Sequence, residues 1–545
     1  MFHQSNTDSQ KTLIDKVFVN FDQVAIDDVY PTCENKEQDV DSELGHKAVL
    51  IRIGHKPPPD KGFKAVVWKT FKAKVRELDE DKDLAESIAK CDPDRLASRE
   101  AIDELAGKVI QTLQNIVDQS TKRVKRKKKT AEKAAIDKLE SEEEKLLKDG
   151  KGGQPLYRFA EKFFHGIDAD EGKDAPSLRQ FKNAAEDKLA NLNLGDAKDT
   201  NVIINRLFGD SEKVIATFPT MKEFKRLVLS TSNSGAKDSH GLTLKLTKTA
   251  IRNSKTIRCT LYSLMRAMAR LGYVPRDWKV DLISFLYKKK GDRRDAKNWR
   301  PITIAACLGK HFDKLLLFQL KRLRNINPDN HAYINDKSCL TAVLALMDFF
   351  KTVREKAKEA KEEDCLLIPM ISLDDISSAF ESIDHNMIDE VLRNTFAEGT
   401  DFDVRGAIRS YLDRKSEIVD RKTGEKVSLE RTYDHKTSPQ GSSLSPVLWR
   451  IFDAIFTEMY KEQLGDLIAQ QPTIVDYFHI AYADGHVTVI VIKVHKDTCH
   501  RDMVDDINAI TELIRDLLDN ASKDAGCGIN PSKQKPVIPP AFIGD

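Results

Sequence analysis

The sequence predicts an α+β fold, in which helices cover one face of an antiparallel sheet. In the second half of the chain, strand-like apolar runs alternate with amphipathic helical patterns, which is typical of this class. The strand-like runs are 280–288, 366–374, 477–484 and 486–494. The helical patterns lie near 310–325, 340–360, 385–397, 445–465 and 502–520. Two of the strands meet at Asp484-Gly485, and Asp-Gly between alternating apolar residues indicates a tight β-hairpin.

N-terminal to these elements, three segments differ in their sequence pattern. Residues 1–55 have the pattern of short strands and loops, and residues 56–153 that of a charged helical connector with a Gly-rich end. Residues 154–270 are mostly helical in pattern, and the last helix is expected to stop at Gly272. We therefore expect residues 271–538 to contain the sheet.

The composition excludes several classes of protein. Lysine and arginine number 88 and aspartate and glutamate 86, so the net charge of +2 gives no global basic surface. No run approaches the ~18 apolar residues of a membrane span, and the N-terminus lacks a secretory signal pattern. The eight cysteines form no CxxC pair, which argues against disulfides and zinc sites. These features predict an intracellular protein, nuclear or cytoplasmic, with no membrane partner.

A basic run at residues 122–129 holds seven lysines and arginines in eight positions. Such a run is either a solvated helix face or a segment that binds polyanions or directs nuclear import. In the second case the candidate nucleic-acid-binding residues are Lys125, Arg126, Lys127, Lys128 and Lys129.

Acidic residues stand at the ends of two predicted strands. Asp484 lies at the tip of the hairpin, and Asp374 and Asp375 end the strand in "MISLDD". Neighbouring side chains on a strand point to opposite faces, so only one of that pair can face the hairpin. Carboxylates from two strand ends can hold a pair of Mg²⁺ ions, which suits phosphoryl transfer.

Two further segments have residue types that fit this chemistry. "SPQGSSLSP" (438–446) is a loop leading into an apolar helix, and "YKKKGDRRDAKNWRPITI" (287–304) is a basic loop before a short apolar stretch. Lysines and arginines near two metal ions would suit a triphosphate. Taken alone, the first segment is equally compatible with an ordinary loop-to-helix junction, and a segment like the second is more often a solvated turn.

The order and spacing of these motifs resemble the reverse transcriptase domain of non-LTR (LINE-type) retrotransposons, over roughly residues 200–538. The matching string is "NWRPI", "DISSAF", "SPQGSSLSP", "YADG" and "GINPSKQK". The resemblance implies a right-hand polymerase, with fingers and palm, that copies an RNA template into DNA. It also implies a DNA primer, deoxynucleoside triphosphates and two Mg²⁺ (or Mn²⁺) ions.

The same resemblance assigns roles to individual residues. Asp375 and Asp484 match the family's catalytic, metal-binding aspartates, whereas Asp374 falls on a usually apolar position. Phe380 matches the aromatic residue that excludes a 2′-hydroxyl. The other matches are Gln440 and Gly441 in the nucleotide-positioning loop, Arg300 with Lys289 and Lys290 at the triphosphate, and Lys533 near the leaving pyrophosphate.

The sequence departs from the family at the hairpin tip. The family has Tyr-Ala-Asp-Asp there, and Gly485 replaces the second aspartate. We expect the glycine to ease the turn. We also expect the lost carboxylate to impair activity, since single electrostatic contacts in such sites are commonly worth ~10²–10³ in rate. His486 is a poor substitute because Mg²⁺ prefers oxygen ligands.

Both ends of the chain also differ from a complete element. Residues 1–55 resemble the last strands of an apurinic-type endonuclease, although only His46 remains of that family's Ser-Asp-His pattern. The chain stops shortly after "NPSK", so a thumb is expected to be absent. These features predict a fragment or decayed copy.

Three functions are compatible with the sequence. They are an impaired RNA-directed DNA polymerase, a non-catalytic nucleic-acid-binding remnant, and another phosphoryl-transfer enzyme such as an RNA-templated RNA polymerase or an intron maturase. Phe380 argues against the use of ribonucleotides. The residues of the "NWRPI" and "SPQGSSLSP" motifs favour the LINE-type polymerase over a maturase.

Nucleic-acid binding by this nearly neutral chain should depend on its local basic segments. Fluorescence anisotropy with labelled RNA should show a steep loss of affinity between about 50 and 200 mM salt. Neutralising Lys288 to Lys290 or residues 125–129 should weaken binding and lower the salt dependence. Binding that neither salt nor these substitutions changes would contradict the prediction.

Overall fold

The computed structural model describes residues 28–31, 49–52, 63–80, 98–124, 175–190, 198, 200–209, 212–232, 234–288, 291–323, 326–419, 426–429, 436, 438–439, 441–530 and 535–537. The chain divides into two compact units. The first comprises Met1–Val67 and Thr121–Asp174, and the second comprises Trp68–Ser120 and Ala175–Asp545.

The first unit contains two short antiparallel strand pairs. Strand β1 (Asp28–Pro31) pairs with β2 (Val49–Arg52), and β3 (Phe63–Val66) pairs with β4 (Thr121–Val124). The basic residues 125–129, as well as His46, lie outside the described residues. Their roles, and the predicted origin of residues 1–55, stay predictions.

Part of the predicted connector belongs to the second unit. Helix α4 (Arg99–Gln119) begins at Ser98, whose side chain caps it by accepting a hydrogen bond from the Ala101 N–H. Its apolar stripe, which includes Ile102, Val109 and Leu113, is buried, and α4 contacts α11 (Lys255–Arg270). The charged pattern of this helix therefore describes only its exposed face. The other predicted domain boundaries stay predictions.

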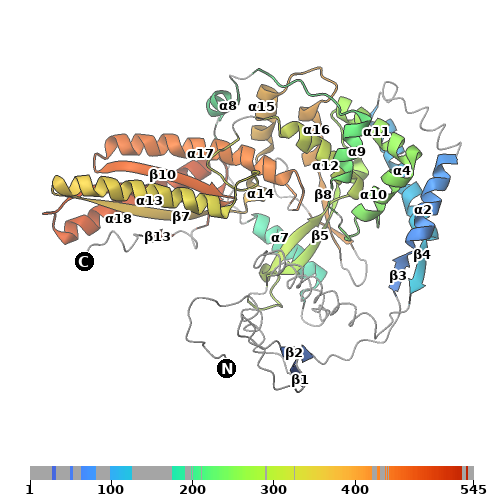
Figure 1. Ribbon diagram of the computed structural model, residues 1–545, viewed down its shortest axis with the longest axis horizontal. Coiled ribbons are helices and arrows are strands. Elements are labelled where there is room, and N and C mark those ends of the chain that lie inside the picture. Colours follow the sequence, from blue (N-terminus) through green and yellow to red (C-terminus); the bar gives the residue numbers. More distant parts are fainter. Residues whose placement is uncertain are drawn as a thin grey trace, which may run out of the picture. The chain divides into compact units, whose positions relative to one another are not determined.

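A cluster of helices forms one part of the second unit (Figure 1). Helix α11 ends before Gly272, which has a φ of +56° and leaves no room for a Cβ beside Asp403 and Gly406. Glycine is therefore the residue that this stop requires. Besides α4 and α11, the cluster comprises α2 (Trp68–Glu77), α9 (Met221–Leu229), α10 (Leu244–Asn253), α12 (Cys307–Leu320) and α16 (Val404–Leu412).

A four-stranded sheet lies next to this cluster, in the order β6-β5-β8-β9. The strands are β5 (Val280–Tyr287), β6 (Trp299–Ile304), β8 (Lys415–Val419) and β9 (Lys426–Leu429), and α7 (Leu178–Ala190) contacts the sheet. Arg414 lies just before β8 and forms two 2.6 Å bonds with the carboxylate of Asp281 on β5. Both residues are buried, so this ion pair fixes how β8 enters the sheet.

A second sheet has the order β10-β11-β7-β12, and β13 also pairs with β7. Its strands are β7 (Cys365–Ser377), β10 (Ile474–Tyr482), β11 (Gly485–His495), β12 (Gly528–Ile529) and β13 (Lys535–Val537). The strand pairs within it are antiparallel. Three long helices lie beside these strands: α13 (Cys339–Glu362), α17 (Ser445–Gln470) and α18 (His500–Asp524). Predicted strands and helices of the second half of the chain thus lie where the sequence places them, with shifted ends.

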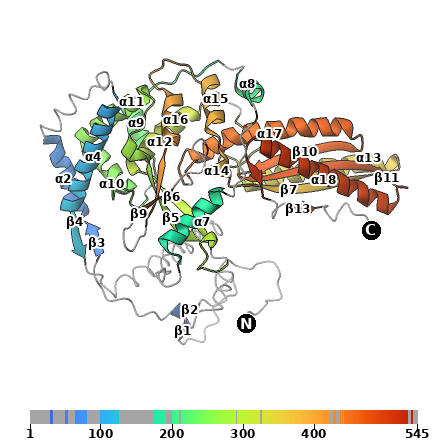
Figure 2. The ribbon, with the colours of Figure 1, turned by 180° about the vertical axis from the view of Figure 1, so that it is seen from behind.

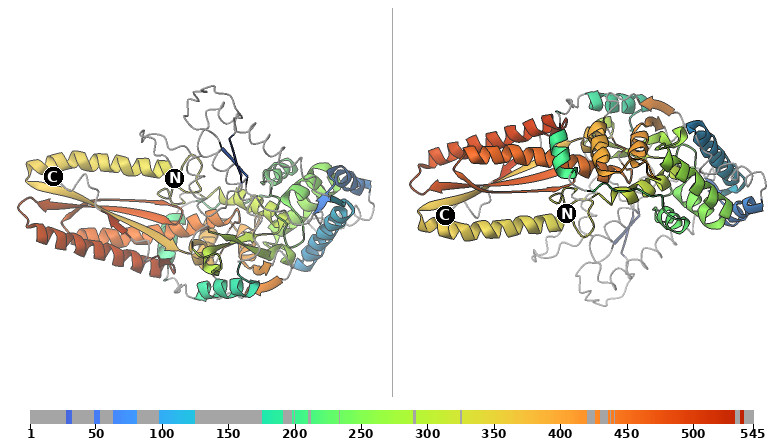
Figure 3. Two further views of the ribbon diagram at one scale, coloured as in Figure 1. Left: turned by 90° about the horizontal axis from the view of Figure 1, so that it is seen from below. Right: turned by 90° about the horizontal axis from the view of Figure 1, so that it is seen from above.

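The prediction that helices cover only one face of this sheet is wrong. Figure 3 shows α13 and α18 on opposite sides of the long strands. Val353 and Ala360 of α13 pack with Leu367 and Val491 on one face. On the other face, the Tyr460 hydroxyl of α17 donates a hydrogen bond to Thr488, and Figure 2 shows α18 in front of β7. The near-continuous apolar runs of β7 and β11 are typical of strands buried on both faces.

The described part of the chain contains six cysteines, all of them free thiols, and four of these are partly or fully buried. None of its helices is both long and apolar enough to cross a membrane.

The Asp281–Arg414 pair gives a test of the fold. Removing one partner leaves an uncompensated buried charge, so Asp281→Ala should lower the free energy of unfolding by about 3–5 kcal/mol. Asp519→Ala is the control, because its ion pair with Lys523 is exposed and solvent-exposed pairs contribute little to stability. Urea denaturation measures both. Equal small losses would show that the buried pair does not organise the sheet.

Candidate functional site

The hairpin that carries Asp484 turns one residue earlier than the sequence predicts. Tyr482 pairs with Gly485, so Ala483 and Asp484 are the two central residues of the turn. Ala483 has a φ of +59°, whereas Gly485 begins β11 with an ordinary φ. The expectation that Gly485 eases the turn is therefore wrong. The strained residue is Ala483, and a left-handed backbone costs a non-glycine residue roughly 1–2 kcal/mol.

Asp375 and Asp484 lie at neighbouring ends of two internal strands of the second sheet. Asp375 is directly opposite Gly485 in the β7–β11 ladder. The next residue of β7, Ile376, donates its N–H to the carbonyl oxygen of Asp484 at 2.9 Å. The turn of the hairpin is thus bonded to the end of β7. The two aspartates therefore end neighbouring strands, and the approach of their carboxylates to a shared metal ion stays a prediction.

Asp374 faces the other side of β7. It is opposite His486, is only 6% exposed and accepts a 2.7 Å hydrogen bond from the Ser372 hydroxyl. Its neighbour Leu373 is 39% exposed. Because side chains alternate along a strand, Asp375 shares the more open face with Leu373. Asp374 and His486 point toward the face covered by α17.

The oxygen-rich pair suits Mg²⁺ or Mn²⁺, but the described residues contain no group of three or more acidic, histidine or cysteine side chains that could hold a metal ion. The position of the third family carboxylate is Gly485. A Cβ added there would have one near neighbour, the Tyr482 carbonyl oxygen at 3.5 Å, which is an ordinary contact. Because Gly485 is opposite Asp375, a side chain at 485 would project toward the same face as Asp375.

Tyr333 lies close enough to Asp484 for the charge of that carboxylate to act on it. Burial raises the pKa of its hydroxyl, and the charges of Asp484 and Tyr482 raise it further. Tyr333 also has a positive φ of 60° and is half-exposed. No local pattern indicates this residue, because its proximity to Asp484 joins segments about 150 positions apart.

Three of the predicted nucleotide-binding residues, Arg300, Phe380 and Gly441, lie in described segments that contact one another. Phe380 lies in the short helix α14 (Ala379–Ser382), and its carbonyl oxygen accepts a 2.8 Å hydrogen bond from the Ser438 N–H. Gly441 has a φ of +104°, and a Cβ there would lie 3.2 Å from the Thr303 carbonyl oxygen of β6. This close approach requires glycine and places Gly441 beside the strand that carries the exposed Arg300. Gln440, Lys289, Lys290 and Lys533 lie outside the described residues.

A buried polar cluster behind the hairpin is absent from the sequence predictions. Asp453 of α17 is fully buried and accepts hydrogen bonds from the side-chain amides of Asn327 (2.6 Å) and Asn330 (2.8 Å). His486 Nε2 lies 3.2 Å from Asp453, within ion-pair distance but without hydrogen-bond geometry. His486 also contacts His479. Burial lowers the pKa of His479 well below its usual value. The sequence signal that could have indicated this cluster is the single aspartate in the otherwise apolar run 451–456.

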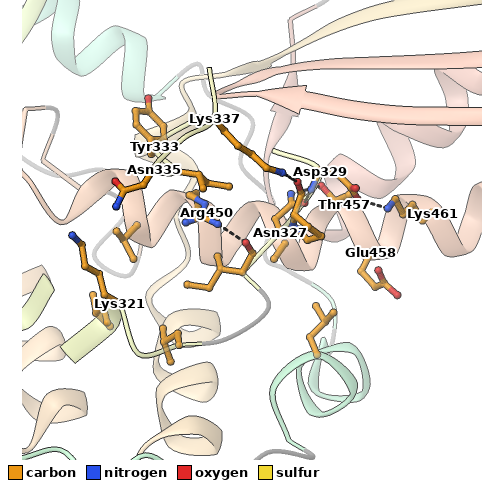
Figure 4. A pocket seen from close by; sticks show the side chains of 18 residues that line it. Lys321, Asn327, Asp329, Tyr333, Asn335, Lys337, Arg450, Thr457, Glu458 and Lys461 are labelled. Carbon is orange, nitrogen blue, oxygen red and sulfur yellow. Dashed lines mark hydrogen bonds and ion pairs between the residues drawn. The ribbon is translucent and has the colours of Figure 1, made fainter. Parts of the chain in front are cut away.

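A cavity of about 820 Å³ lies beside this cluster (Figure 4). Three of its four cationic residues bind the loop at 326–329, which forms one wall. Arg450 donates to the Ile326 carbonyl oxygen, Lys337 to that of Pro328 at 2.6 Å, and Lys461 to the Asp329 carboxylate. These three cations therefore hold the loop in place.

Comparison with known proteins agrees with this arrangement. The family described as reverse transcriptase (RNA-dependent DNA polymerase) matches residues 287–541, a segment that contains the second sheet and its hairpin. A polyprotein of the type-1 retrotransposable element R2 from Popillia japonica is 28% identical over 34% of this chain and 24% of its own length.

A probable RNA-directed DNA polymerase from the X-element transposon of Drosophila melanogaster is 23% identical over 42% of this chain and 24% of its own length. A similar protein from the BS transposon of the same fly is 23% identical over 36% of this chain and 21% of its own length. The chain thus matches about a quarter of the length of these curated relatives. Residues 287–541 thus form a reverse transcriptase domain, and this domain is similar to those of the non-LTR retrotransposons R2, X-element and BS.

Proposed function

We propose that this chain extends a DNA primer on an RNA template with deoxynucleoside triphosphates, and that Gly485 impairs the reaction. The observation that carries the proposal is the bonding of the Asp484 turn to the end of β7 beside Asp375. Two carboxylates at neighbouring strand ends are an oxygen-ligand set for divalent metal ions.

In this proposal each residue has one task. Asp375 and Asp484 bind two Mg²⁺ or Mn²⁺ ions, which when bound stabilise the attacking and leaving oxygens of an in-line displacement. Arg300, with Lys289 and Lys290, binds the triphosphate as a charge-assisted donor. Phe380 excludes the 2′-hydroxyl.

The remaining parts act on the template and the leaving group. Gln440 and Gly441 position the template and the incoming nucleotide, and Lys533 acts near the leaving pyrophosphate. The fingers and palm of a right-hand polymerase would then correspond to the two sheets with their helices. The compartment, nuclear or cytoplasmic, stays a prediction.

The impairment follows from the geometry at position 485. Gly485 is opposite Asp375, so the family's second aspartate would add its charge on the face that Asp375 occupies. Its absence leaves two carboxylates to offset the charge of two divalent ions. Single electrostatic contacts of this kind are commonly worth ~10²–10³ in rate.

Restoring the carboxylate tests the proposal. Gly485→Asp should raise primer extension on poly(rA)/oligo(dT) by about 10²-fold or more, because the contact is electrostatic and the backbone has room for a side chain. Gly485→Asn is the matched control, since it fills the same space without charge and should give no such gain.

Two outcomes would argue against this account. Extension by the Gly485→Asp protein that survives Asp375→Asn would show that the signal does not come from this site. No extension by either the parent or the Gly485→Asp protein would favour a non-catalytic nucleic-acid-binding remnant, the function that the missing carboxylate otherwise supports.

A further inference from the structure

We propose that Asn330 is a positioning residue that holds the catalytic hairpin in its strained turn. The role deepens, and rests on, the proposed polymerase function. Asn330 lies in the loop between α12 and α13, far in sequence from the hairpin, and its side chain is completely buried.

The side-chain amide of Asn330 forms hydrogen bonds with both backbone polar groups of the turn residue Ala483. Its Nδ2 donates to the Ala483 carbonyl oxygen at 2.9 Å, and its Oδ1 accepts the Ala483 N–H at 3.1 Å. A side-chain amide has two donors and two acceptor lone pairs. The other donor binds Asp453 and the other lone pair takes the Ala332 N–H at 3.1 Å. The whole hydrogen-bonding capacity of Asn330 is therefore used.

Ala483 is the residue of the hairpin that most needs such support. Its positive φ of 59° is a conformation that alanine rarely adopts. In two-residue hairpin turns, a positive φ at the first central position is usually supplied by glycine. A third hydrogen bond, from Trp449 Nε1 to the Ala483 carbonyl oxygen at 2.9 Å, adds to the two from Asn330. Asp484 follows directly, so the direction of its carboxylate depends on how Ala483 is held.

Asn330 can hold Ala483 because its own loop is fixed at several points. The Asp329 carbonyl oxygen accepts the Ala481 N–H at 2.9 Å, and the Ala481 carbonyl oxygen accepts the His331 N–H at 2.9 Å. The loop thus forms a parallel bridge with β10. On its other side, Arg450 and Lys461 of α17 bind the loop beside the cavity in Figure 4.

Asn327 provides a matched control in the same loop. It is also buried, and its amide also donates to Asp453, at 2.6 Å. Its other side-chain bonds go to Thr457 and to the Asp329 N–H, and none of its described bonds reaches Ala483. Asn330→Ala and Asn327→Ala therefore remove similar buried bonds, but only the first releases the turn.

The experiment combines hydrogen–deuterium exchange with primer extension, in the full chain carrying Gly485→Asp. Asn330→Ala should speed amide exchange in peptides covering 474–495 and reduce extension by about 10²-fold, the scale of a small misplacement of a catalytic group. Asn327→Ala should lower the melting temperature by a similar amount, while exchange at the hairpin and extension stay near the parent.

A suppressor makes the test specific for positioning. Glycine adopts a positive φ without strain, so Ala483→Gly should restore most of the extension lost in Asn330→Ala. A purely structural role for Asn330 would leave the double variant as inactive as the single one. If Asn330→Ala does not fold, Trp449→Phe removes one bond to Ala483 while keeping an aromatic ring. It should also speed exchange at the hairpin.

The outcomes separate this proposal from the proposed function. Equal exchange at the hairpin in Asn330→Ala and Asn327→Ala, or no restoration by Ala483→Gly, would overturn the positioning role. Absence of extension in every protein would count against the polymerase function alone, because the exchange comparison still decides whether Asn330 holds the turn.

Discussion

The pairing register between β7 and β11 is the constraint on which the rest of the site depends. It sets Asp375 opposite Gly485 and Asp374 opposite His486. Because side chains alternate along a strand, a slip of one residue would exchange the two faces. Asp374 would then enter the open face and Asp375 would be buried against α17. The apolar residues of both strands, packed against α13 on one face and α17 on the other, make such a slip costly.

The same register explains why polar residues occur in this core. His486 follows the turn and must point toward α17, where Asp453 and His479 meet it. Buried polar groups are expensive unless they are paired, and most members of this cluster have partners. Once present, the cluster also binds Asn327 and Asn330, so it ties the hairpin to a loop of a distant segment. The site therefore depends on a polar network as well as on strand pairing.

Local sequence patterns predicted a large part of this arrangement. The Asp-Gly signal located the hairpin, and the order of the motifs identified Asp375 rather than Asp374 for the open face. The centre of the turn was missed because Asp-Gly favours a positive φ at the residues it occupies, whereas bonds from Asn330 and Trp449 stabilise that conformation at Ala483 instead. Such contacts join residues 153 and 34 positions apart, which no local pattern reports. The second covered face of the sheet was missed although the continuous apolar runs of β7 and β11 carried that information.

The central claim is that Asp375 and Asp484, and not Asp374, form the metal-binding pair. Mn²⁺ binding followed by electron paramagnetic resonance tests it without requiring catalysis. The account predicts that Asp375→Asn and Asp484→Asn each weaken Mn²⁺ binding by about tenfold or more, the scale on which even residues that only hydrogen-bond to metal ligands act. It also predicts that Asp374→Asn leaves binding unchanged. Loss of binding in Asp374→Asn together with retention in Asp375→Asn would contradict it.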